Sequence, residues 1–107
     1  MKDQYKEVTQ LANQDRARNG ATLAIHMSKL AEEVGELANA INILSGRKGT
    51  KKVTTKEKIA ARKNLLEEAA DCIQIIFGIT SQVEFSYSDL SKELHKKNKK
   101  YRKFVHK

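Results

Sequence analysis

Two pairs of acidic residues stand out because each has the spacing of ligands on one helix face. Glu33 and Glu36 are three residues apart in "LAEEVGELANAI", and Glu68 and Asp71 are three apart in "NLLEEAADCIQII". Residues with this spacing lie one turn from each other on the same side of a helix. Carboxylate oxygens from two facing helices are the ligands that Mg²⁺ and Mn²⁺ prefer. The spacing therefore predicts a divalent-cation site formed by these four residues.

The sequence around the second pair favours a bound cation over an ion pair. The chain has 21 Lys and Arg residues and a formal net charge of +8, so basic neighbours are abundant. None of the positions three or four residues from Glu68 or Asp71 is basic, and the segment is largely apolar. An unpaired buried carboxylate is strongly destabilising, and a metal ion would compensate for it. The alternative is that both acidic pairs lie on solvated helix surfaces and bind nothing.

The histidines and the cysteine narrow the choice of metal. Di-iron helical bundles use Glu-x-x-His pairs, but His26, His95 and His106 all lie outside such spacings. We expect His26 to be a surface or packing residue and the other two to belong to the basic C-terminal segment. Cys72 is the only cysteine, which excludes an internal disulfide and argues against a zinc site built on cysteines. A reducing cytoplasm is the expected compartment.

Four helices are expected to position the acidic pairs. The absence of Pro and Trp and the scarcity of Gly favour long helices over β structure. Apolar periodicity and stop signals place the helices at about residues 3–18, 22–45 and 54–83, with the last from about residue 88. In the second helix, apolar residues alternate four and three apart, as in a seam that packs on other helices. The chain is therefore predicted to be one all-α domain over residues 1–107.

Local signals mark several of the helix ends. Asn19-Gly20 should stop the first helix, and Gly46 stands where a C′ glycine would end the second. Thr54 and Glu57 have the spacing of a capping box at the start of the third. The second half of that helix is apolar on nearly all sides, which is typical of a central helix covered by several partners or by another subunit.

Charge is distributed unevenly along the chain. Residues 22–45 and 64–87 carry net negative charge, whereas residues 46–63 and 88–107 are strongly basic. The basic segments are either solvated surface or a means of attracting an anion such as phosphate or nucleic acid. The loop that contains Arg47, Lys48, Lys51 and Lys52 would join the two metal-bearing helices, so its tip could fold over a bound phosphate.

The acidic motifs and their surroundings resemble a known family. "EEVGE" followed by "EEAAD" is similar to the E-x-x-E … E-x-x-D signature of the MazG-like nucleoside triphosphate pyrophosphohydrolases, which belong to the all-α NTP pyrophosphatase superfamily. "KLAEEVGELANAI" and "NLLEEAADCIQII" look like two successive helices of that family. The resemblance covers about residues 22–104. It implies a MazG fold resembling a four-helix bundle and completed by oligomerisation, as a homodimer or homotetramer.

The resemblance also implies a function. It predicts hydrolysis of NTPs or dNTPs between the α and β phosphates, with Glu33, Glu36, Glu68 and Asp71 as the catalytic, Mg²⁺-binding residues and Mn²⁺ as a possible substitute. A role in nucleotide-pool housecleaning would follow. The last helix of such proteins often carries basic residues that contact the phosphates, and "KKNKKYRKF" is similar. The phosphate-binding candidates are Lys97, Asn98, Lys100 and Arg102, together with Lys51 of the loop.

The sequence departs from the family pattern in two places. The basic loop makes the interval between the acidic pairs longer than expected, and the arginine of the last helix is displaced by about one residue, so Lys100 is an alternative to Arg102. No Trp or other obvious aromatic residue lies near the motifs to stack on a base, and the preferred nucleotide therefore stays open.

Two other functions also fit parts of the sequence. A small basic helical module that binds nucleic acid or a protein would explain the pI of about 9.7 and the Lys-rich C-terminal segment, but not the acidic pairs. The third hypothesis is a metal-free helical bundle with a structural or antitoxin-like role. The N-terminus lacks the apolar core of a signal peptide, and no apolar run reaches the length of a membrane span.

Overall fold

The computed structural model describes residues 1–46 and 52–107, which form helices and no strand. The helices are α1 (Lys2–Asn19), α2 (Leu23–Leu44), α3 (Thr55–Gln82) and α4 (Tyr87–Val105). The predicted all-α class is confirmed. The predictions for residues 47–51, including Lys51, lie outside the described residues.

The helix ends follow the local signals of the sequence. Gly20 adopts a left-handed conformation with φ of 68°, and its backbone N–H donates to the carbonyl of Arg16. Thr54 and Glu57 form the predicted capping box, in which the Thr54 hydroxyl accepts from the Glu57 N–H and the Glu57 carboxylate accepts from the Thr54 N–H. A second capping box, between Ser86 and Asp89, starts α4 slightly earlier than predicted. These caps satisfy N–H groups that have no partner inside the helix.

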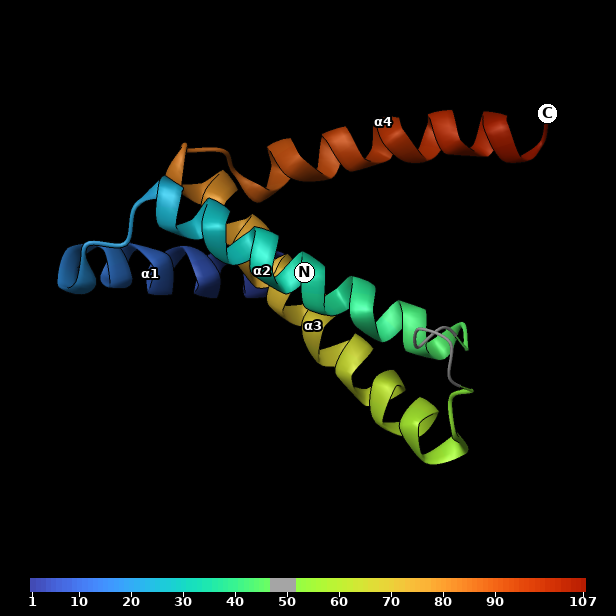
Figure 1. Cartoon of the computed structure of the whole chain (residues 1–107). Helices are drawn as coiled ribbons and strands as arrows, with labels where there is room; N and C mark the ends of the chain where they lie inside the picture. The colour runs from blue at the N-terminus through green and yellow to red at the C-terminus, as the bar shows by residue number, and fades with distance from the viewer. Residues whose placement is uncertain (47–51) are drawn as a thin grey trace.

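Helices α2 and α3 lie side by side and antiparallel, as Figure 1 shows. Small side chains allow this close approach, because Ala40 of α2 and Ala61 of α3 are both buried. Cys72 and Ile75 add apolar surface to the core further along α3. The α2–α3 pair is therefore the frame that holds the two acidic motifs opposite each other.

Helix α1 covers the C-terminal half of α3. Ala12 packs against Gly78, where a Cβ added to the glycine would be in ordinary van der Waals contact with the alanine Cβ at 3.9 Å. Tyr5 is buried, with its ring edge-on to Phe77 at 5.0 Å between centroids. Its hydroxyl donates to the carbonyl of Phe85 at 2.7 Å and lies 3.1 Å from the Thr80 hydroxyl. Tyr5 thus joins the start of α1 to the end of α3 and the turn that follows.

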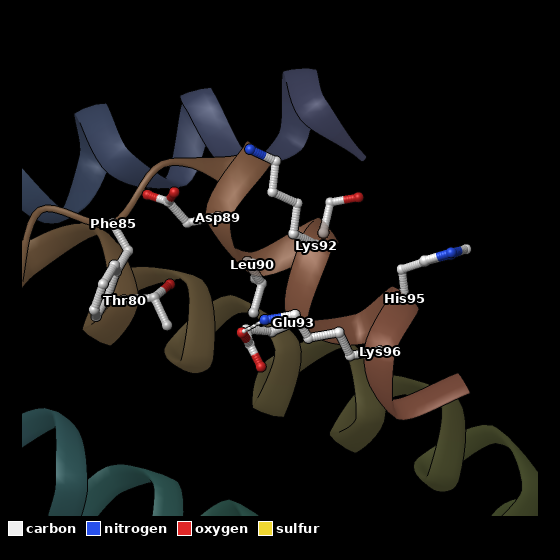
Figure 2. Close-up of a pocket in the computed structure, with 9 residues that line it drawn as sticks. Thr80, Phe85, Asp89, Leu90, Lys92, Glu93, His95 and Lys96 are labelled. Atoms are coloured by element: carbon white, nitrogen blue, oxygen red, sulfur yellow. Dashed lines mark hydrogen bonds and ion pairs between the residues drawn. The ribbon is translucent and has the colours of Figure 1, made fainter. Parts of the chain in front are cut away.

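Helix α4 leaves the rest of the chain soon after it begins. Figure 1 shows it projecting away from the α2–α3 pair, and within the described residues its few helix–helix contacts are mainly with α1. Its first turns border an open pocket of about 880 Å³ with Thr80, Phe85 and Leu90 in its lining (Figure 2). All residues from Ser91 to the C-terminus are exposed.

The single chain is extended for its size. It exposes 8679 Å², whereas a compact monomer of 12.1 kDa is expected to expose roughly 6,000 Å². Its radius of gyration is 17.0 Å, against about 13 Å for a compact domain of this length. Large apolar side chains remain exposed on α2 and α3, including Val34, Ile41, Ile59 and Leu66.

Candidate metal centre

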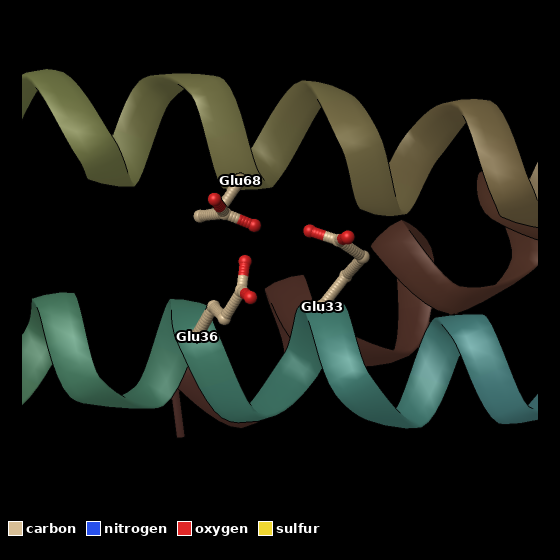
Figure 3. Close-up of side chains that lie close together, drawn as sticks. All are labelled: Glu33, Glu36 and Glu68. Carbon is tan, nitrogen blue, oxygen red and sulfur yellow. The ribbon is translucent and has the colours of Figure 1, made fainter.

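Three of the four predicted carboxylates meet between α2 and α3. Figure 3 shows Glu33 and Glu36 reaching from α2 toward Glu68 of α3. One carboxylate oxygen from each residue lies within 4.8 Å of the other two. We call Glu33, Glu36 and Glu68 the carboxylate cluster. The antiparallel pairing of the two helices thus brings together side chains that are 32 or more residues apart in the sequence.

The carboxylate cluster lacks compensating partners. Glu33 and Glu68 are half-buried, and the Oε2 atom of each is fully covered without a hydrogen-bond partner. Among the described residues, no basic side chain forms an ion pair with any of the three. Covered carboxylate oxygens that accept no hydrogen bond are destabilising. A proton or a cation between the carboxylates would relieve this.

The pKa values of groups in and beside the cluster also indicate that its carboxylates require a proton or a cation. The pKa of Glu68 is raised from 4.5 to about 8, first by the hydrogen bond that protonated Glu68 can make to the Glu33 side chain, then by burial and by Glu36. Ionised carboxylates only accept hydrogen bonds, so this bond exists only while one of the pair is protonated. The pKa of the Cys72 thiol is also raised, first by burial and then by Glu33, Glu68 and Asp71. Among the described residues, no ion pair therefore offsets the negative charge of this region.

The residues of the carboxylate cluster fit a small divalent cation. Mg²⁺ binds oxygen at about 2.0–2.1 Å in octahedral geometry, so opposite ligand atoms lie about 4.2 Å apart. The cluster places three carboxylate oxygens within 4.8 Å of one another, and Glu36 is exposed, which leaves room for water or a phosphate oxygen. Carboxylates without histidine or thiolate ligands suit Mg²⁺ or Mn²⁺.

Asp71 stands apart from the other three acidic residues. It is exposed, so within this chain it is not the buried carboxylate that its largely apolar sequence segment suggested. Helix α1 packs on α3 next to Asp71 but does not bury the Asp71 side chain. Asp71 and Glu33 instead line one pocket of about 540 Å³ between α1, α2 and α3, which we call the α1–α3 pocket.

The α1–α3 pocket contains polar residues that the sequence interpretation did not select. His26 was expected to be a surface or packing residue, and it is half-buried, with an Nε2 atom that is covered and has no hydrogen-bond partner among the described residues. His26 precedes Glu33 by seven residues, which places both on one helix face, and this spacing was the available signal. Asp15 of α1 could not be selected in this way, because the weak apolar periodicity of α1 does not show which of its faces packs on the other helices. The remaining polar lining residues are Lys29 and Gln74.

The structure does not bring the predicted phosphate-binding residues to the carboxylate cluster within one chain. Lys97, Asn98, Lys100 and Arg102 are exposed on α4. Within the described residues α4 has no extended contact with α2 or α3. Lys51 lies outside the described residues.

The fold and the cluster together define an all-α protein with a partly buried, uncompensated carboxylate site between two antiparallel helices. No protein-family model, curated protein or solved structure matched the chain when it was compared with them. Among the helices that the structure describes, none has both the length and the apolar character needed to cross a membrane.

The raised pKa of Glu68 predicts how stability depends on pH when no metal is present. The unfolded chain loses this proton near pH 4.5, whereas the folded chain keeps it to about pH 8. The folded state binds more protons in this interval, so stability should fall as pH rises from about 4.5 to about 8 and then level off. Urea unfolding in EDTA at several pH values measures this. Glu68→Gln should lack this component, and identical pH profiles for the two proteins would contradict the assignment.

Proposed function

We propose that the protein is a Mg²⁺-dependent nucleoside triphosphate pyrophosphohydrolase. The observation that carries the proposal is the carboxylate cluster, whose covered oxygens lack partners in a chain with 21 basic residues. The family resemblance of the two acidic motifs supports the same function. A purely solvated acidic surface would not leave a covered oxygen of Glu33 and of Glu68 without a hydrogen-bond partner among the described residues.

In this proposal the carboxylates of the cluster have two roles, binding the cation and accepting a proton. Glu33, Glu36 and Glu68 would hold the cation, which when bound neutralises phosphate charge and lowers the pKa of a water molecule. A carboxylate oxygen of the cluster that is not engaged by metal accepts the proton of the attacking water. The water oxygen forms a bond to the α-phosphorus while the bond from that phosphorus to the bridging oxygen breaks. Pyrophosphate leaves with the bridging oxygen, and a nucleoside monophosphate remains.

The α1–α3 pocket is the proposed position of the nucleoside. Its volume of about 540 Å³ lies in the range of small-molecule sites, and Glu33 connects it to the carboxylate cluster. The Nε2 atom of His26 is covered and unpartnered, so a small rotation of the ring would let it bind a polar group of a base or sugar. Asp71, on the same pocket, is positioned to accept a hydrogen bond from the sugar or to approach the metal from that side.

Product analysis tests the proposed function. The protein is incubated with each NTP and dNTP, with Mg²⁺ or with EDTA, and the products are separated by ion-exchange chromatography. Pyrophosphate and nucleoside monophosphate should appear in equal amounts, and only with Mg²⁺. Release of orthophosphate, or no turnover of any nucleotide, would overturn the proposal.

One observation favours a second candidate function, binding of nucleic acid. Helix α4 is exposed from Ser91 onward and carries most of the basic residues of the C-terminal segment. A module of this kind would bind DNA or RNA with an affinity that falls steeply with salt and does not depend on Mg²⁺. A filter-binding series in increasing NaCl, with and without EDTA, distinguishes it from the hydrolase.

A further inference from the structure

Helix α4 has an exposed apolar face. Positions 90, 94, 97, 101 and 104 alternate four and three residues apart, which places them on one side of the helix. Leu94, Tyr101 and Phe104 are 52%, 67% and 71% exposed, and the Tyr101 and Phe104 rings stack 6.5 Å apart. Beyond the first turn of α4, nothing among the described residues covers this face (Figure 1). We call Leu90, Leu94, Tyr101 and Phe104 the apolar stripe.

The opposite face of α4 is basic. The same alternation recurs two residues later, which is about 200° around an α-helix, at Lys92, Lys96, Lys99 and Lys103. Lys96 pairs with Glu93 at 3.0 Å, whereas Lys99 and Lys103 have no ion-pair partner among the described residues. No Asp or Glu follows Glu93 in the sequence. The exposed part of α4 is therefore an amphipathic helix with a polar face of one charge sign.

We propose that α4 lies on anionic phospholipid membranes, with the apolar stripe inserted among the acyl chains and the basic residues in the headgroup layer. Helices that lie in this interface combine large apolar residues on one face with Lys and Arg on the other. The charged residues of α4 exclude a membrane span, so the contact is with the membrane surface. Tyr101 suits the boundary between lipid and water, because its ring is apolar and its hydroxyl is polar.

Lys97 favours a lipid surface over a packed protein partner. It lies within the apolar stripe, between Leu94 and Tyr101. A helix packed against the stripe would bury the Lys97 ammonium, which is destabilising unless an acidic residue pairs with it. At a membrane surface the lysine stem lies along the acyl chains while the ammonium reaches the headgroup phosphates. A bilayer therefore accommodates the whole stripe without a further partner.

The apolar stripe also favours a membrane over nucleic acid. A phosphate backbone would attract the basic face but would leave Leu94, Tyr101 and Phe104 in water. A membrane with anionic lipids uses both faces, and each basic residue close to its surface strengthens binding about fivefold. Assembly through exposed apolar residues of α2 and α3, such as Ile59 and Leu66, would leave α4 free for this contact.

Co-flotation of the full chain with vesicles tests the proposal without reference to hydrolysis. Vesicles of phosphatidylcholine mixed with phosphatidylserine should bind wild type at least about tenfold more tightly than phosphatidylcholine alone. Phe104→Ser should weaken binding at least about tenfold, because it removes a large apolar side chain from the inserted face. Met27→Ser removes an equally exposed side chain, 71%, from α2 and should bind as wild type does. Circular dichroism confirms that both variants are folded. No vesicle binding by wild type, or equal effects of the two variants, would overturn the proposal.

A tryptophan reporter separates insertion into lipid from attraction to charge. The chain contains no Trp, so Tyr101→Trp provides a single emitting residue on the apolar stripe. Anionic vesicles should shift its emission to shorter wavelength and protect it from quenching by acrylamide, whereas duplex DNA should do neither. Protection in the free protein would show that a second copy already covers the stripe. Vesicle binding without a shift would assign the binding to charge alone, and either of these two results would overturn the proposal.

Discussion

Glu68→Gln should be more stable than wild type in the absence of metal and should lose Mg²⁺-dependent hydrolysis. Glu68 stands within 4.8 Å of the carboxylates of Glu33 and Glu36, and its charged form is disfavoured in the folded chain. A neutral amide removes this repulsion and can donate to Glu33. The midpoint of urea unfolding in EDTA should therefore rise at pH 8. At pH 4.5 the gain should disappear, because Glu68 is then largely protonated in the folded chain and half protonated in the unfolded chain.

The same substitution should lower turnover by at least about 100-fold, because even residues behind the metal ligands cost 10–100-fold when replaced. Glu67→Gln is the matched control. It makes the same chemical change one residue earlier, at an exposed position outside the carboxylate cluster. Glu67→Gln should match wild type both in turnover and in the midpoint of urea unfolding in EDTA. Near-normal turnover in Glu68→Gln would remove Glu68 from the site, and a loss of metal-free stability would contradict the repulsion.

Mg²⁺ should stabilise the folded protein far more than Na⁺ at the same ionic strength. A cation that binds the folded but not the unfolded chain adds about 2.7 kcal/mol when its free concentration is 100 times Kd. For a domain of this size that corresponds to roughly 10 °C in the melting temperature. Sodium ions only screen charges, and they screen the basic segments as well as the acidic ones. Thermal melting in EDTA, Mg²⁺, Mn²⁺ and matched NaCl measures the difference.

The helix ends and the acidic pairs could be predicted because their causes lie within a few residues of sequence. The Gly20 cap and the capping box of Thr54 and Glu57 depend on local backbone geometry alone. The pairing of α2 and α3 follows from apolar faces that periodicity displays, and the short connection between Leu44 and Thr55 makes the pair antiparallel. Glu33, Glu36 and Glu68 were therefore placed correctly on facing sides of the two helices.

The environment of Asp71 and the α1–α3 pocket could not be predicted, because both depend on which helix covers which part of α3. Periodicity shows that a surface is apolar but not what packs there. Helix α1 docks through Tyr5 and Ala12 onto Phe77 and Gly78, and this leaves Asp71 exposed. The pocket then forms from contacts between three helices, which no local pattern encodes.

The direction in which α4 runs also could not be predicted from the sequence. Its residues form a strong helix, and the capping box of Ser86 and Asp89 starts it firmly. That cap also lowers the pKa of Asp89, chiefly through the Ser86 backbone N–H. Nothing in the local sequence determines where such a helix lies when most of its length has no packing partner among the described residues.

Calorimetric titration of Mg²⁺ tests most directly the central claim that the carboxylate cluster is a metal site. Wild type should give a saturable binding isotherm with Mg²⁺, and Mn²⁺ should compete for the same site. Glu67→Gln should bind as wild type does, whereas Glu68→Gln should bind at least about tenfold more weakly. A flat titration of wild type, or equal binding by Glu68→Gln and Glu67→Gln, would contradict the account.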